Sequence, residues 1–195
     1  LPNLAVGIHT VISRFNVESF YSVANELMRL NPDSYITEIA EERVELDTIG
    51  LDITPGKVAY KSAIDYLIHR IKNGQYKGMN KITMAFRIEY YNLVKAVLRD
   101  EKQIIPCYSG VASCQISPEG DIWSCCVKAK SLGNLRDTRY NFRKIWWGKK
   151  ARKDRKSIHA KECYCPLANA SYTNMLMDIP TLLRVSYRSL IRWWS

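Results

Sequence analysis

The sequence predicts an α/β fold in its first half and a small, cysteine-rich α+β domain near its end. Three observations support this division. Strand, helix and strand patterns follow one another within the first 40 residues. Two amphipathic helical patterns come next. All six cysteines then lie between positions 107 and 165, around a predicted hairpin.

The first 40 residues predict a βαβ unit. Residues 4–13 form a continuous apolar run rich in β-branched side chains, which is typical of a strand buried on both faces. Asn16 offers an N-cap for a helix over residues 17–30, and residues 34–40 have a second strand pattern. This order predicts a parallel pair of strands with a right-handed crossover.

Such a unit is incomplete by itself. Two parallel strands and one crossover helix cannot cover both faces of a sheet, although parallel sheets are normally buried on both faces. We therefore expect further strands and helices to precede Leu1 in a longer protein.

The following segments alternate helices and turns. Thr54-Pro55 resembles a helix start, and the apolar spacing that follows it continues to Gly74. A second amphipathic helix is expected over residues 80–99. Pro118-Glu119-Gly120 lies between two short strand patterns and predicts a hairpin. Gly133-Asn134 predicts a turn, and residues 139–158 predict a basic helix.

The net charge of +10 is concentrated in the last third of the chain. Residues 1–127 hold 13 basic and 15 acidic residues, whereas residues 128–195 hold 16 basic and 4 acidic residues. This pattern indicates either a polyanionic partner or a solvated basic face. No secretory signal or membrane-spanning run is present, so we expect a cytoplasmic location.

The cysteine pattern favours a metal site over disulfides, because the cysteines cluster in a sequence without a secretory signal. Cys107 and Cys125 enclose the predicted hairpin, and Cys163 and Cys165 follow the basic helix. Four thiolates suit an iron–sulfur cluster or a structural zinc ion. The C-x2-4-C knuckles that zinc domains usually carry are absent, which favours iron and sulfur.

Residues 104–170 resemble the SPASM/Twitch domains of radical S-adenosylmethionine enzymes. The resemblance begins with Cys107 and the Gly120-Asp-Ile-Trp-Ser-Cys125 segment, and it continues through Gly133-Asn134-Leu135 and Ile145-Trp146 to the last cysteine pair. Full SPASM domains carry a longer final cysteine run and hold two clusters. The shorter run here resembles the Twitch variant, which implies one auxiliary 4Fe-4S cluster on Cys107, Cys125, Cys163 and Cys165.

Two cysteines remain outside this set. Cys114 either packs in the core or replaces one of the four ligands, as an extra cysteine does in some relatives. Cys126 follows Cys125 directly, so on a strand its side chain would point to the opposite face. We expect packing roles for both.

The resemblance also implies an architecture for the whole chain. Residues 1–53 would be the last βαβ part of a partial (β/α) barrel, 54–103 a helical connector, 104–170 the cluster domain and 171–195 a basic amphipathic helix. His9, Arg14 and Glu38 stand at or near the ends of the barrel strands, where they would approach a cofactor or substrate. Alternatively, they are ordinary residues of a buried strand.

The C-x3-C-x2-C motif that binds the radical-generating cluster is absent from the 195 residues. The resemblance therefore implies the C-terminal part of a longer oxidoreductase or maturase, or a remnant of one, that is not catalytic by itself. S-adenosylmethionine would bind only in the full-length enzyme, with the missing N-terminal half. The auxiliary cluster would accept an electron from a peptide or small-molecule substrate, position it, or brace the fold. Lys128 and Lys130 would raise its potential if they lie close.

The last segment allows a further interpretation. Arg184, Arg188 and Arg192 recur every four residues before Trp193-Trp194, so the helix either lies on an anionic membrane surface or packs back on the protein. The alternative function is a non-enzymatic zinc module that contacts nucleic acid or an anionic membrane through its basic third. Nucleic acid is the less favoured partner, because the aromatic residues form no recognisable stacking motif.

Overall fold

The computed structural model describes residues 4–190 and begins with the predicted βαβ unit. Strand β1 (Gly7–Ile12), helix α1 (Phe20–Arg29) and strand β2 (Ser34–Ile39) follow in that order. The two strands are parallel and pair in register from Gly7 with Ser34 to Ile12 with Ile39. The predicted α/β character is thus confirmed for this part of the chain.

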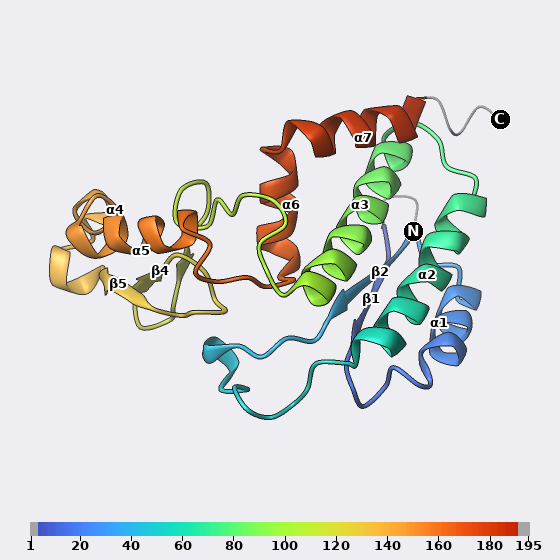
Figure 1. Cartoon of the computed structure of the whole chain (residues 1–195), viewed down its shortest axis with the longest axis horizontal. Coiled ribbons are helices and arrows are strands. Elements are labelled where there is room, and N and C mark those ends of the chain that lie inside the picture. The colour runs from blue at the N-terminus through green and yellow to red at the C-terminus, as the bar shows by residue number, and fades with distance from the viewer. Residues whose placement is uncertain (1–3, 191–195) are drawn as a thin grey trace.

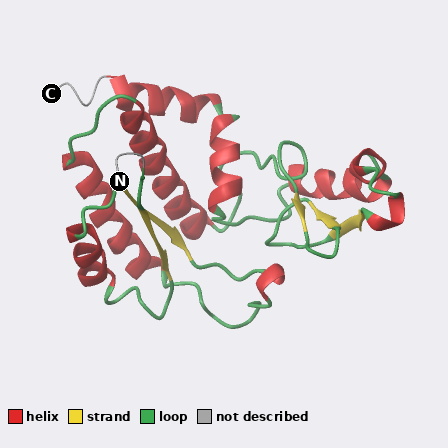
Figure 2. Ribbon diagram, turned by 180° about the vertical axis from the view of Figure 1, so that it is seen from behind, coloured by secondary structure: helices red, strands yellow, loops and turns green. Residues whose placement is uncertain are grey.

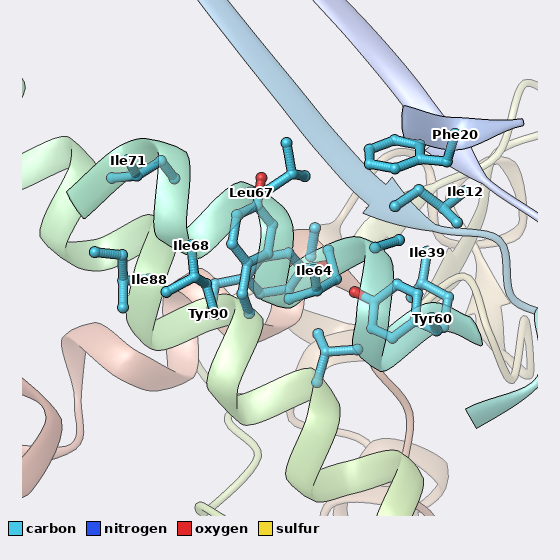
Figure 3. Packing of buried hydrophobic residues seen from close by; sticks show 14 of the residues in the cluster. Ile12, Phe20, Ile39, Tyr60, Ile64, Leu67, Ile68, Ile71, Ile88 and Tyr90 are labelled. Atoms are coloured by element: carbon cyan, nitrogen blue, oxygen red, sulfur yellow. The ribbon is translucent and has the colours of Figure 1, made fainter. Parts of the chain in front are cut away.

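Only one face of the strand pair is covered. Ile12 and Ile39 point into the main core with Phe20 of α1 and Tyr60 and Ile64 of the following helix, as Figure 3 shows. On the other face His9 and Val11 are exposed. The prediction of a first strand buried on both faces is therefore wrong within residues 4–190. Helix α1 and the helix that follows β2 pack on the opposite side, and the sheet has two strands within residues 4–190.

Two long helices pack beside the βαβ unit and form the larger lobe of the molecule together with it (Figure 1). Helix α2 spans Lys57–Asn73 and helix α3 spans Met79–Asp100. Helix α3 covers the free edge of β2, where the Arg87 guanidinium donates a 2.8 Å hydrogen bond to the Tyr35 carbonyl oxygen. The hydroxyl of Thr37 donates to that of Tyr91 at 3.0 Å on the same side. One backbone acceptor at this edge of the sheet is thereby occupied by a side chain.

Two predicted helix starts are displaced. Asn16 does not cap α1; its side chain accepts from the Ser13 N–H and donates to the Val11 carbonyl, which shapes the turn after β1. Thr54 does not cap α2 either, since that helix begins after Gly56. In both places the predicted cap lies three or four residues before the first residue of the helix.

The smaller lobe is set apart from the parallel pair (Figure 2). Strands β3 (Gln115–Ile116), β4 (Asp121–Trp123) and β5 (Ser131–Asn134) form an antiparallel sheet. The predicted hairpin is confirmed between β3 and β4, where Gly120 adopts a φ of 93°. The predicted turn at Gly133-Asn134 is wrong, because both residues belong to β5. A Cβ at Gly133 would approach Ile145 to 3.1 Å, so this glycine permits close packing of sheet and helix.

The predicted basic helix is divided into two. Helix α4 spans Phe142–Trp146 and helix α5 spans Lys149–His159, with Trp147 and Gly148 between them. A short 3₁₀ turn, η2 (Arg136–Thr138), precedes them; a similar turn, η1 (Val44–Leu46), follows β2. The break turns α5 so that its Ala151 and Ile158 can face the interior.

The chain returns to the larger lobe through α6 (Ala168–Leu176) and α7 (Ile179–Leu190). Arg184 and Arg188 of α7 both donate to the buried Glu89 of α3, at 2.8 and 2.6 Å. The described part of the C-terminal helix therefore packs back on the protein. Arg192 and Trp193-Trp194, which belong to the membrane interpretation, lie outside the described residues. No helix within residues 4–190 combines the length and apolar character that crossing a bilayer requires.

Candidate metal centre

The four predicted ligand cysteines come from three separate segments. Cys107 lies in the loop after α3, Cys125 lies two residues after β4, and Cys163 and Cys165 lie on the extended segment between α5 and α6. All four are free and partly buried. Folding therefore brings residues that are up to 58 positions apart in the sequence into one small lobe.

Three of these cysteines, Cys107, Cys163 and Cys165, border one small cavity. Burial raises the pKa of Cys163, and the neighbouring Cys107 and Cys125 raise it further. Burial also raises the pKa of Cys165, to which the same two cysteines again contribute. A thiol that resists ionisation by itself becomes a thiolate when a metal cation supplies the compensating charge.

Backbone N–H groups point at two of the sulfurs. Burial raises the pKa of the Cys125 thiol, whereas hydrogen bonds from the N–H groups of Lys128 and Val127 lower it. The N–H of Leu167 has the same lowering effect on Cys165. Hydrogen bonds to sulfur orient metal-bound thiolates and adjust the potential of iron–sulfur clusters.

Lys128 is the basic residue that accompanies the cysteines. Its ammonium group lies 2.8 Å from the Asp154 carboxylate and 3.2 Å from the Ser157 hydroxyl, both on α5. After burial, the positive charge of Lys128 is the main influence that lowers the pKa of Cys163. Lys130 is exposed, and its charge acts on Asp154. The structure thus places Lys128 near two of the cysteines and gives no such effect for Lys130.

The two remaining cysteines pack against apolar side chains. Cys126 is buried with Leu167 and Ala170, and burial raises its pKa to about 11. It lies in a turn after β4 rather than on a strand, so the predicted strand alternation does not apply. Cys114 packs against the core beneath the small sheet. Both side chains fill space in the small lobe.

Glu41 is a residue that the sequence analysis missed. It follows β2 by two residues, is 7% exposed, and pairs with Arg43 at 3.1 Å through one carboxylate oxygen. The other oxygen has no hydrogen-bond partner among residues 4–190. Burial raises its pKa to about 7, and its charge in turn raises the pKa of Cys165. The sequence shows only an acidic residue after a strand.

The loop that carries Glu41 joins the two lobes. The N–H of Val44 donates to the Val127 carbonyl at 3.2 Å, beside the cysteine turn. Glu45, in the same loop, forms a side-chain hydrogen bond with Cys126. The end of the βαβ unit therefore contacts the cysteine-bearing lobe directly.

The strand-end residues separate into two groups. His9 and Glu38 come together on the bare face of the sheet, with 3.7 Å between the His9 Nε2 and a carboxylate oxygen of Glu38. Arg14 instead pairs with Asp52 on the surface, and its N–H donates to the Ile53 carbonyl at 3.0 Å. Arg14 thus contacts the segment between β2 and α2 and does not join His9 and Glu38.

Within residues 4–190, no three or more His, Cys, Asp or Glu side chains are already arranged to hold a single metal ion. A cavity of about 40 Å³ borders Cys107, Cys163 and Cys165. The chemistry of the donor set fits a cluster: four soft sulfurs, N–H donors aimed at two of them, and a nearby ammonium group.

Comparison with known proteins identifies this segment. Residues 107–166 match the family model of SPASM, an iron–sulfur cluster-binding domain. The match starts at Cys107 and ends one residue after Cys165, so it includes every predicted ligand. It confirms the resemblance found in the sequence. No curated protein and no solved structure matches the chain.

Proposed function

We propose that the SPASM domain at residues 107–166 holds one auxiliary 4Fe-4S cluster on Cys107, Cys125, Cys163 and Cys165. The observation that carries this proposal is that the SPASM match includes four free, partly buried cysteines from three segments, three of which border one small cavity. Four thiolates would occupy all four iron sites. When bound, such a cluster supplies one-electron transfer at a potential set by its surroundings.

The residues around the cysteines have distinct roles in this proposal. The N–H groups of Val127, Lys128 and Leu167 would stabilise the thiolate charge and orient the sulfurs. The ammonium group of Lys128, held in place by Asp154, would favour the more negatively charged, reduced form. The protein thereby determines the position and potential of the cluster.

We further propose that the chain is the C-terminal part of a radical S-adenosylmethionine oxidoreductase. The parallel β1–β2 pair supports a partial (β/α) barrel, because its one bare face carries His9 and Glu38 and the outer edge of β1 pairs with no strand among residues 4–190. Further strands would continue the sheet at that edge. S-adenosylmethionine and a peptide or small-molecule substrate would then bind in the complete enzyme, in the cytoplasm.

Anaerobic reconstitution with iron and sulfide tests the cluster. The protein should become brown and contain about four iron and about four sulfide per chain. A matched sample supplied with zinc alone provides the comparison. A colourless protein that retains one zinc ion through dialysis, and takes up no iron, would contradict the proposal and support the zinc module.

The alternative of a zinc module on an anionic membrane loses part of its support. Two of the three arginines that suggested it, Arg184 and Arg188, are engaged by Glu89. The exposed basic residues of α4 and α5 remain as the basis for a polyanionic partner. Binding of DNA or anionic vesicles that weakens with salt would test that alternative.

A further inference from the structure

The segment that carries Cys163 and Cys165 has no regular secondary structure. It runs from the end of α5 to the start of α6, between the two lobes of Figure 1. Within the described part of the chain, 4–190, the backbone of residues 163–166 forms no hydrogen bond with other backbone groups. Fixing such a segment in one conformation costs conformational entropy, so its position depends on the side chains that bond to it.

Gln103 bonds to this segment and to helix α5 at the same time. Its side-chain NH2 group donates to the carbonyl oxygens of Cys163 and Ile158, both at 3.0 Å. Both partners are acceptors, so only the NH2 side of the amide can satisfy them. Gln103 precedes Cys107 in the loop after α3. One side chain thereby connects two of the segments that carry proposed ligands.

Two buried side chains of the larger lobe hold backbone groups beside the other ligands of this cavity. The hydroxyl of Tyr90, in α3, donates to the Pro166 carbonyl oxygen at 3.3 Å. The side-chain oxygen of Asn174, in α6, accepts the Tyr108 N–H at 2.7 Å. Both residues held in this way directly follow a proposed ligand in the sequence. Tyr90 and Asn174 are buried, so water competes little for either contact.

These three side chains belong to a part of the chain that the family model does not cover. Gln103, Tyr90 and Asn174 all lie outside residues 107–166. Gln103 and Asn174 also line the cavity of about 40 Å³ that borders three of the proposed ligands. We propose that the three are positioning residues, which hold the ligand segments in place before the cluster binds. This inference rests on the proposed cluster, and it extends the cluster site into the larger lobe.

Holding the sulfurs in place affects both the affinity and the properties of a cluster. Segments that are already ordered lose less conformational entropy when the cluster binds, so binding is tighter. Removing outer contacts of this kind typically weakens metal binding by about 10- to 100-fold. A displaced ligand segment also changes the hydrogen bonds and solvent exposure of the sulfurs, which set the potential of a cluster.

Three variants of the whole chain test the positioning. Gln103→Met keeps the length of the side chain and removes its donor. After reconstitution, iron release to a chelator should be about tenfold faster than in the unchanged protein. The electron paramagnetic resonance spectrum and the midpoint potential of the cluster should change as well. Tyr90→Phe and Asn174→Leu each remove one hydrogen bond and should act in the same direction, more weakly.

Tyr91→Phe is the matched control. Tyr91 is the next residue on the same helix and is as deeply buried as Tyr90, but its hydroxyl accepts from Thr37 of β2 at 3.0 Å. The change should lower thermal stability without altering iron release, spectrum or potential. The proposal is overturned if iron release and spectra stay unchanged in Gln103→Met and Tyr90→Phe. Equal changes in Tyr90→Phe and Tyr91→Phe would also overturn it, because they would show a general loss of stability.

Hydrogen exchange of the metal-free protein separates this proposal from the cluster itself. Gln103→Met should speed amide exchange in residues 162–165, and Tyr91→Phe should not. If the unchanged protein takes up no iron, the cluster assignment fails, whereas the exchange rates still decide whether Gln103 holds the segment. Equal exchange in Gln103→Met and the unchanged protein would contradict the positioning role even if the cluster forms.

Discussion

The ammonium group of Lys128 donates to the buried carboxylate of Asp154 at 2.8 Å and so ties the turn after Cys125 to helix α5. Asp154 is 4% exposed, so this pair is shielded from solvent on one side. The carboxylate fixes where the positive charge of Lys128 lies relative to Cys125 and Cys163. A structural contact thereby controls the electrostatics of the proposed cluster.

Replacing Lys128 should change the potential of the reconstituted cluster. Lys128→Gln keeps a donor for Asp154 but removes the charge, so the midpoint potential should fall by on the order of 50 mV. Lys130→Gln removes an exposed charge two residues away and serves as the control. Redox titration followed by electron paramagnetic resonance measures both. Equal shifts in the two variants would contradict a specific role for Lys128.

Five of the six cysteines should fall into two classes on substitution. Alanine at Cys107, Cys125, Cys163 or Cys165 should reduce the iron retained after reconstitution and desalting, because each removes a proposed ligand. Cys126→Ala should retain about four iron per chain and lower the free energy of unfolding by about 1 kcal/mol, because Cys126 is buried against Leu167. Iron analysis and thermal unfolding separate the classes. Loss of iron in Cys126→Ala, with iron retained in the other four variants, would show that Cys126 is a ligand and would contradict the proposed ligand set.

The carboxyl group of Glu41 predicts a pH-dependent stability. Burial raises its pKa from 4.5 to about 7 in the folded state, so the folded protein binds this proton more tightly than the unfolded chain does. The stability it contributes at low pH is lost as the pH rises from about 4.5 through about 7, by up to about 3 kcal/mol. Glu41→Gln should remove this loss. Urea unfolding at several pH values measures it, and parallel profiles for both proteins would refute the assignment.

The two ion pairs between Glu89 and helix α7, formed by Arg184 and Arg188, should contribute unequally to stability. The side chain of Arg188 is 21% exposed and that of Arg184 is 50% exposed, so solvent screens the Arg184 pair more strongly. Arg188→Ala should lower the free energy of unfolding by about 2 kcal/mol and Arg184→Ala by under about 1 kcal/mol. Chemical denaturation measures both changes. A larger effect at Arg184 would reverse this ranking.

Much of the local structure could be predicted from the sequence. The βαβ order, both connector helices and the hairpin around Gly120 depend on spacing within one segment, and periodicity reports such spacing directly. The cysteine pattern likewise predicted the SPASM match, because the order of ligands and turns is preserved along the chain. Errors arose at Gly133 and at the break before α5. In both, packing of α4 against the small sheet overrides the local pattern.

The sequence by itself determined the order of most elements and the order of the cysteines along them. Only the tertiary structure decided that the charge of Glu41 acts on Cys165. It also decided that Arg184 and Arg188 both form ion pairs with Glu89. Arg87, in contrast, is buried and forms no ion pair with a carboxylate of residues 4–190. These relationships join residues far apart in the chain. Hydrophobic periodicity shows which face of an element is buried, but not which charged groups are buried with it. That choice is made when the elements pack.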